Sequence, residues 1–395
     1  MRILFLAEMM NVGNASFRIR LRTAQLLAER GHDVTFVSPS PSSFSMRITK
    51  DCDRVRLIET LGVAPMAFRR GGFSFLDAVI KIWIAVSQRY DVIHVSCGHR
   101  PAQLLPALAA KILRGSVIVD EWWEWYGAGG RADSCGGWMQ RLISWYDRLT
   151  EVPTKKLFHG VIAISSALRD RIPTHPRVVV LNGAAEAEVL RSYNMEEARL
   201  PLGLPMDLFI IGLPSVGAAD HADNAPFLEA VAKLRLCHPE LRLFVTGEAG
   251  YIKKLEDKDG LVDGIIGRSW LPYNQYNLYL SACNVFALPL LDIPRNRGRW
   301  PHKLGDFLLL NRPVITTPVG DIAPLFASYR LGILSDGTLS GYQAALTCVI
   351  GDVDRQHLCV DASKVTRTHL DQFNRVASIE HLYLSALEGA REPVH

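Results

Sequence analysis

The sequence alternates short apolar segments with amphipathic segments, and this alternation occurs twice along its length. Short apolar runs separated by helical stretches are typical of a parallel sheet that is covered by helices on both faces. Each series therefore predicts one doubly wound α/β domain, and we expect two such domains in tandem. The expected strands are residues 3–7, 33–37, 91–95, 116–120, 161–164, 178–181, 208–212, 241–245, 264–266, 285–288, 314–316 and 332–334. The expected helices include residues 16–30, 225–237, 272–282, 301–310 and 371–387.

The break between the two series sets the expected domain boundary. A chain of 395 residues is too long for one ordinary core, because domains average about 150 residues. The alternation stops near Asn182, so we expect a first domain over residues 1–185, a linker over 186–205 and a second domain over 206–370. A closing helix within residues 371–395 is expected to pack back on the first domain. Since ligands bind beyond the carboxyl ends of parallel strands, two such domains that face each other would enclose a cleft.

Composition narrows the class of protein. Apolar residues make up 48% and charged residues 21% of the chain, as in folded globular proteins. The seven cysteines show no Cys-x-x-Cys spacing, which argues against a zinc site or a disulfide framework and fits a reducing compartment. The apolar start is too short for a signal peptide, and the apolar stretch at 75–86 is interrupted by Asp77 and Lys81. We therefore expect a cytoplasmic protein. We expect no nucleic-acid partner, because the sequence has no dense stripe of basic residues.

The most informative segment is LLDIPRNRGRWPHKLGDFLLLNRPVITTPVGD, residues 290–321. Pro301 stands where a helix is expected to begin, so the amides of its first turn would be free to bind an anion. Lys303 and Asp306 share one face of this helix, where the cation suits a diphosphate and the carboxylate suits sugar hydroxyls. A solvated basic loop with a surface Lys–Asp pair is the alternative interpretation. The donor-binding residues expected here are Asn296, Arg299, Trp300, Pro301, His302, Lys303 and Asp306, and Lys303 is also a catalytic candidate.

Two loops of the first half supply further candidates. In NVGNASFRIR, Gly13 permits a tight turn near a ligand and Arg18 is expected to face the donor, although a plain β–α turn is the alternative. His99, in the loop after the strand expected at 91–95, is a catalytic candidate.

The loop DEWWEWYG, residues 120–127, places carboxylates among tryptophans. Aromatic rings stack on sugars, and a carboxylate against tryptophan can have a raised pKa and exchange protons. One interpretation is an acceptor pocket in which Glu121 or Glu124 orients the attacking hydroxyl. The other is aromatic packing at a domain interface.

The segment RGRWPHKLGDFLLLNRPVITTPVGD resembles the donor motif of GT-B-fold glycosyltransferases, in particular of family four. The residues that carry this resemblance are Pro301, Lys303, Asp306, Phe307, Leu308, Arg312, Pro313, Val314, Gly320 and Asp321. Weaker similarities follow the family's order in RGHDVTFVS, YDVIHVS, HGVIAISSALRDRI and VLNGAAE. The resemblance implies two Rossmann-like domains that face a cleft.

Three positions depart from the family pattern. The first of two glutamates at the donor helix falls on Gly298. The Arg and Lys that commonly hold the diphosphate are missing from residues 212–226, where His221 is the nearest cationic candidate. The loop at 120–127 lacks the family's histidine.

The resemblance also implies an activity. A retaining transferase would move a sugar from a UDP- or GDP-sugar, held mainly by the second domain, to a hydroxyl of a glycan, lipid-linked or small-molecule acceptor. Such an enzyme of polysaccharide biosynthesis would use no metal ion and no cofactor. A nucleotide-sugar epimerase of the same architecture and a non-catalytic nucleotide-binding relative are the alternatives.

Membrane contact is an open expectation. Residues 67–75 and 138–148 mix aromatic with basic side chains, which suits either an anionic membrane on its inner face or ordinary packing of an amphipathic helix. Residues 1–200 carry 26 Lys and Arg against 19 Asp and Glu, so this half could be steered toward an anionic partner, or the excess is ordinary scatter.

Overall fold

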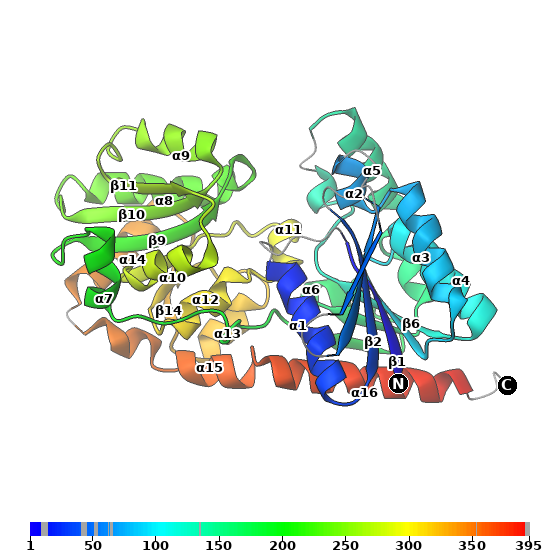
Figure 1. Cartoon of the computed structure of the whole chain (residues 1–395). Coiled ribbons are helices and arrows are strands. Elements are labelled where there is room, and N and C mark those ends of the chain that lie inside the picture. Colours follow the sequence, from blue (N-terminus) through cyan, green and yellow to red (C-terminus); the bar gives the residue numbers. More distant parts are fainter. Residues whose placement is uncertain are drawn as a thin grey trace. The chain divides into compact units, whose positions relative to one another are not determined.

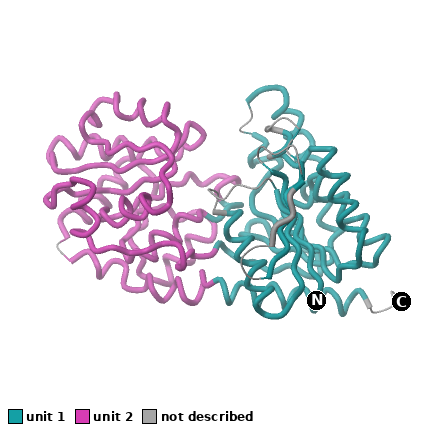
Figure 2. The backbone as a smooth tube through the Cα atoms, viewed as in Figure 1, with its two compact units in different colours: residues 1–183, 297–300, 372–395 teal, residues 184–296, 301–371 magenta. Residues whose placement is uncertain are grey.

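The computed structural model describes residues 1–8, 15–40, 46–50, 54–61, 63, 66–133, 136–352 and 354–391. The chain forms two compact units (Figure 2). Unit 1 combines residues 1–183, 297–300 and 372–395, and unit 2 combines residues 184–296 and 301–371. Each unit holds a largely parallel sheet with helices on it, which confirms the predicted tandem α/β architecture.

The sheet of unit 1 has the strand order β3-β4-β2-β1-β5-β6-β7-β8. Its strands pair in parallel, while β3 pairs antiparallel with β4 at the edge. The strands are β1 (Arg2–Leu6), β2 (Asp33–Pro39), β3 (Arg47–Lys50), β4 (Val55–Thr60), β5 (Val92–Ser96), β6 (Val117–Trp122), β7 (Gly160–Ala163) and β8 (Val178–Val180). Most positions of β1, β2, β5 and β6 are buried, as expected of strands covered on both faces.

Helices cover the two faces of this sheet. They are α1 (Ala15–Glu29), α2 (Met66–Gly71), α3 (Phe75–Ser87), α4 (Pro101–Arg114), α5 (Trp138–Thr150), α6 (Ser166–Arg169) and α16 (Gln372–Arg391), with the 3₁₀ turns η1 (Arg131–Asp133) and η2 (Pro153–Leu157). Capping residues define several helix ends. The side chain of Ser74 accepts a hydrogen bond from the amide of Asp77 at the start of α3, and Gly115 ends α4 in the left-handed conformation. Helices α3 and α4 pack side by side (Figure 1).

The closing helix α16 belongs to the core of unit 1. It contacts α1, β6 and β7. Its buried residues Val376, Ile379 and Tyr383 join the apolar cluster formed by α1 and one face of the sheet. Unit 1 is therefore completed by residues from the end of the chain.

Unit 2 has the strand order β11-β10-β9-β12-β13-β14, and in the part of the chain that the structure describes all neighbouring strands pair in parallel. The strands are β9 (Phe209–Val216), β10 (Leu241–Gly247), β11 (Ile265–Ser269), β12 (Val285–Leu288), β13 (Val314–Thr316) and β14 (Gly332–Leu334). The helices and turns are α7 (Met195–Arg199), η3 (Leu200–Leu202), η4 (Ala218–Asp220), α8 (His221–Leu234), α9 (Ala249–Glu256), α10 (Tyr273–Ser281), α11 (Pro294–Arg297), α12 (Lys303–Leu309), α13 (Ile322–Ser328), α14 (Leu339–Gly351), η5 (Arg355–Cys359) and α15 (Ala362–Thr368).

Each sheet reverses its strand order at one point. In unit 1 the chain adds β2 on one side of β1 and later places β5 on the other, and in unit 2 it does the same around β9 with β10 and β12. Ligands of doubly wound sheets bind beyond the carboxyl ends of the strands at such a switch point. The two switch points, β1/β5 and β9/β12, are therefore the places to look for a site.

Candidate functional site

Lys303 lies at the switch point of unit 2. Its Nζ donates to the carbonyl oxygen of Pro214 in β9 over 3.0 Å. The side chain is half-buried, and it places a positive charge at the carboxyl end of the central strand. This is the position where a doubly wound domain binds an anionic ligand group.

The start of α12 differs from the prediction. The helix begins at Lys303 with His302 as its N-cap, so Pro301 precedes the helix and is not its first residue. The amides of Leu304 and Gly305 donate to the carbonyls of Pro301 and His302, each over 2.9 Å. The expectation that these first-turn amides are free for an anion is therefore wrong. The positive charge at this point comes from the side chain of Lys303.

Asp306 lies one turn further along α12. Its Oδ1 accepts the hydroxyl of Tyr273 over 3.3 Å, and both side chains are half-buried. Tyr273 is the first residue of α10. Because it is far from Asp306 in the sequence, local spacing does not predict this contact. A carboxylate that is held in this way keeps further lone pairs for hydroxyl donors.

A buried carboxylate organises the loop after β12. Asp223 of α8 accepts from the amide of Leu291 over 3.0 Å and from Nδ2 of Asn296 over 2.8 Å. Arg295 pairs with its second oxygen over 3.1 Å. Nδ2 of the buried Asn296 is used inside unit 2, so this residue fixes the loop, and its contact with the sugar donor stays a prediction.

The expected donor residues are divided between the units. Arg299 and Trp300 group with unit 1, whereas Pro301, His302 and Lys303 group with unit 2. Arg299 is half-buried. Trp300 is only 5% exposed, and its part in donor binding stays a prediction.

The structure explains the missing family glutamate at position 298. A Cβ on Gly298 would lie 2.6 Å from Cβ of Trp125, which is closer than such atoms approach in proteins. Glycine is therefore required by the close approach of the loop at 120–127 within unit 1.

Glu121 lies in a buried ion network at the end of β6. Its Oε1 accepts from Arg375 of α16 over 2.6 Å and its Oε2 from Arg20 of α1 over 3.2 Å, and His94 lies 3.4 Å away. Burial alone would raise the pKa of Glu121, but the neighbouring imidazole and the two guanidinium groups hold this pKa well below its ordinary value. The expectations of a raised pKa and of a role in proton exchange for Glu121 are therefore wrong.

His99 is also internal to unit 1. It is fully buried, its Nε2 accepts from Nε of Arg100 over 2.9 Å, and Asp147 lies 3.1 Å away. Burial and then the charge of Arg100 lower the pKa of His99 well below its ordinary value. The prediction of His99 as a catalytic group that faces a ligand is corrected by this burial.

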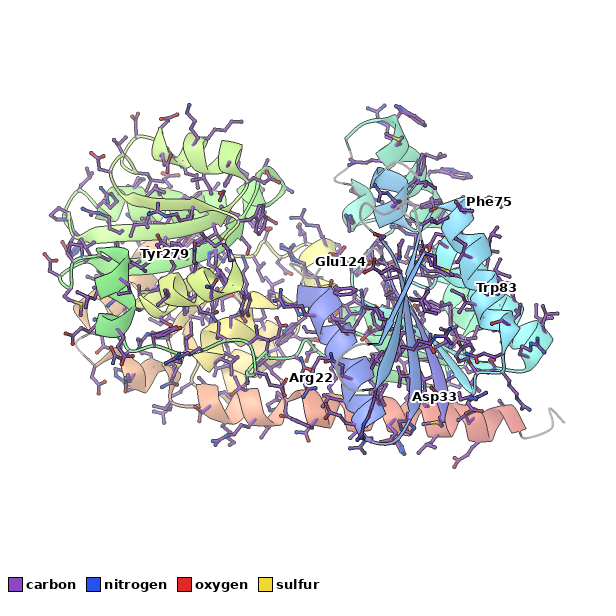
Figure 3. The ribbon with its side chains drawn as sticks, viewed as in Figure 1. Arg22, Asp33, Phe75, Trp83, Glu124 and Tyr279 are labelled. Carbon is purple, nitrogen blue, oxygen red and sulfur yellow. The ribbon has the colours of Figure 1, made fainter. Side chains whose placement is uncertain are left out.

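Glu124 follows β6 and remains accessible. Its side chain is 42% exposed and pairs with Arg131 over 3.1 Å (Figure 3). Of the carboxylates predicted in this loop, Glu124 is the one that solvent reaches. Arg18 of α1 is half-buried, and the predicted Gly13 lies outside the described residues.

Sequence reasoning missed the arginines of the buried network. Arg20 lies 4.4 Å from the ring centre of Trp123, and Arg375 lies 5.7 Å from it. These two residues are far from Glu121 in sequence, so no local spacing connects the three. Among the described residues, no group of three or more His, Cys, Asp or Glu is arranged to hold a metal ion, and no described helix meets the length and apolarity needed to cross a bilayer.

Comparison with known proteins identifies the architecture. Residues 18–194 match the family described as the glycosyl transferase 4-like domain. None of the curated proteins matches the sequence significantly. Sucrose-phosphate synthase from Thermosynechococcus elongatus is a similar solved structure, with a TM-score of 0.74 and 15% identity over 98% of this chain and 100% of that one.

Two further solved structures are similar over most of their length. HepE from Anabaena in complex with UDP and glucose has a TM-score of 0.67 and 14% identity, with 98% of this chain and 100% of that one covered. The catalytic domain of starch synthase IV from Arabidopsis thaliana, bound to ADP and acarbose, has a TM-score of 0.66 and 14% identity, with 98% and 99% covered. At these identities the likeness establishes the fold. The chain has the GT-B fold of these structures, and residues 18–194 match the family described as the glycosyl transferase 4-like domain.

Proposed function

We propose that this enzyme is a retaining glycosyltransferase that moves a sugar from a UDP- or GDP-sugar to a hydroxyl of a glycan, lipid-linked or small-molecule acceptor. The observation that carries the proposal is the position of Lys303 at the β9/β12 switch point. HepE in complex with UDP and glucose and starch synthase IV bound to ADP support a nucleotide-sugar donor.

In this proposal, unit 2 holds the donor. The ammonium of Lys303 neutralises charge that develops on the leaving diphosphate. The carboxylate of Asp306 accepts hydrogen bonds from hydroxyls of the donor sugar, and the hydroxyl of Tyr273 orients this carboxylate. The sugar is transferred on one face, and a donor phosphate oxygen helps to deprotonate the acceptor, as the family resemblance implies. The reaction needs neither a metal ion nor a cofactor.

Unit 1 takes the acceptor in this proposal. The accessible carboxylate of Glu124 offers a hydrogen-bond acceptor for a sugar hydroxyl. Polysaccharide biosynthesis is the proposed setting, with the enzyme in the cytoplasm and in peripheral contact with the inner face of a membrane.

A donor panel with product analysis tests the proposal. The enzyme is incubated with UDP- and GDP-sugars, with and without cell lipid extract or glycan acceptors. Product that forms only when an acceptor is present supports transfer, and retained anomeric configuration in that product supports the retaining course. Conversion of the donor alone would instead indicate an epimerase, and binding without turnover would indicate a non-catalytic relative.

A further inference from the structure

Three helices of unit 1 expose an unusual number of apolar side chains. These are α3, α4 and α5, and we call their outward side the α3–α5 surface. It is defined by the exposed residues Phe75, Trp83, Ile112, Leu113, Trp138 and Trp145. Several large apolar side chains exposed on neighbouring helices, aromatics among them, indicate an interaction site on a folded protein.

Helix α5 has its apolar side turned outward. Trp138, Leu142, Trp145 and Leu149 recur every three or four residues and are all exposed, with Trp138 at 70% and Trp145 at 60%. The residues that α5 buries are polar, Ser144 and Asp147. An amphipathic helix on a globular core ordinarily shows the reverse arrangement.

A buried ion pair fixes this orientation. Oδ2 of Asp147 accepts from Nη2 of Arg100 over 2.7 Å, and both side chains are buried. Arg100 precedes α4 and also donates to the carbonyl of Gly71 at the end of α2. If α5 turned its tryptophans inward, Asp147 would move away from Arg100. The buried guanidinium of Arg100 would then lose its counter-charge, which is costly. The outward stripe is therefore a property of the folded unit.

Helix α3 also buries its charged residues and exposes large apolar ones, although Ala78, Ile84 and Ala85 are buried as well. Its only charged residues, Asp77 and Lys81, are buried and pair over 2.8 Å, and Nζ of Lys81 also donates to the carbonyl of Ala7. In contrast, Phe75 is 81% and Trp83 is 62% exposed. Both project from the side of α3 that faces away from the sheet (Figure 3).

The three helices are neighbours. Helices α3 and α4 pack along their length. The ring of Phe73, just before α3, lies 5.0 Å from the ring of Tyr146 in α5. The hydroxyl of Tyr146 donates to the carbonyl of His99, just before α4. The exposed apolar residues are therefore carried by elements that are packed together on one side of unit 1 (Figure 1).

The exposed charge on these helices is positive. Their acidic residues, Asp77 and Asp147, are both buried, whereas Arg114, Arg141 and Arg148 are exposed. Asp133 of η1 borders the surface and pairs with Arg148. These helices thus expose tryptophans and arginines but no acidic residues. Tryptophan rings suit the interfacial region of a bilayer, and arginines suit anionic lipid headgroups.

We propose that the α3–α5 surface docks unit 1 on a bilayer of anionic phospholipid. Phe75, Trp83, Trp138 and Trp145 enter the headgroup region, and Arg114, Arg141 and Arg148 contact lipid phosphates. The inference deepens the membrane contact in the proposed function by naming the surface and the lipid. It is tested separately from transfer, because vesicles without donor or acceptor suffice.

Vesicle sedimentation of the full chain tests the inference. The wild type is mixed with vesicles of phosphatidylcholine alone, or of phosphatidylcholine with phosphatidylglycerol. We expect binding to the anionic vesicles, weakening as salt is raised. The double variant Trp138→Ser/Trp145→Ser should bind them at least about tenfold more weakly, and Arg141→Glu should weaken binding in the same direction.

Trp270 offers a matched control. It is 68% exposed but belongs to unit 2, so Trp270→Ser should bind vesicles like the wild type. Circular dichroism and thermal unfolding establish that all variants are folded. Equal vesicle binding by the wild type and the Trp138/Trp145 variant, or no binding by either, would overturn the inference. Concentration-dependent dimerisation of the wild type without lipid, lost in that variant, would show that the surface joins two copies instead. Failure of vesicle binding alongside intact transfer would leave the proposed reaction standing.

Discussion

Nη2 of Arg375 lies 2.6 Å from Oε1 of Glu121, so the last helix of the chain supplies a counter-charge to a buried carboxylate at the end of β6. Both side chains are almost fully buried. We predict that Arg375→Ala lowers the free energy of unfolding by about 3 kcal/mol, because it leaves the charge of Glu121 only partly compensated. Denaturant unfolding followed by circular dichroism measures this loss.

A surface ion pair provides the comparison. Arg30 pairs with Glu380, which lies on α16 like Arg375, but the side chain of Arg30 is 47% exposed. Arg30→Ala should therefore change the free energy of unfolding by less than about 1 kcal/mol. If both variants lose the same small amount, the buried network does not stabilise unit 1 in the way described.

His159 gives unit 1 a pH dependence. Burial, followed by the charges of Lys111 and Arg177, lowers its pKa to about 4, from about 6.5 in an unfolded chain. A lowered histidine pKa means that the folded state binds fewer protons. The corresponding stability is present above about pH 6.5 and is lost as the pH falls toward 4.

We expect His159→Gln to flatten this part of the stability profile. The amide of Ile118 donates to Nδ1 of His159 over 3.0 Å, and the glutamine oxygen can accept the same bond. Since His159 is only half-buried, the effect should be about 1 kcal/mol after solvent screening. Urea unfolding at several pH values measures it, with the exposed His357→Gln as control. A wild-type slope that persists in His159→Gln would assign the pH dependence to another group.

Glu124 and Glu121 should respond differently to the loss of charge. Glu124→Gln is expected to lower kcat by about tenfold or more, with little change in the donor KM, because the accessible carboxylate is proposed to orient the acceptor. Glu121→Gln should instead lower the unfolding temperature, since its carboxylate neutralises buried arginines. Steady-state kinetics and thermal unfolding of both variants separate these roles. The exposed Asp170→Asn should change neither quantity, and unaltered kcat in Glu124→Gln would remove Glu124 from the acceptor site.

Much of the fold could be predicted from hydrophobic patterning. The expected strands at 285–288, 314–316 and 332–334 coincide with β12, β13 and β14. The edge strand β3 and its neighbour β4 are not among the expected strands, because their sequences RITK and VRLIET mix charged with apolar residues. The patterning also favours inward apolar faces, and α5 does the opposite because a buried ion pair sets its orientation.

The site could be predicted only where its residues are close in sequence. Lys303 and Asp306 share one short helix, as their spacing predicts, and their role in donor binding is the proposal made above. Tyr273, Arg20 and Arg375 reach their partners through tertiary structure, and nothing in local spacing indicates those contacts. Helix α12 begins two residues later than expected, because Pro301 and His302 form the turn whose carbonyls accept the amides of Leu304 and Gly305.

The most direct test of donor binding at the β9/β12 switch point is calorimetric titration of UDP and GDP into the wild type and Lys303→Ala. Lys254→Ala, on the exposed side of α9 in the same unit, serves as the matched control. We predict that at least one nucleotide binds the wild type and the control alike. Its Kd should rise about 10- to 100-fold in Lys303→Ala, the loss of one charge-assisted contact, while the unfolding temperature is unchanged. Equal Kd values for the wild type and Lys303→Ala would contradict the assignment of this lysine to the donor diphosphate.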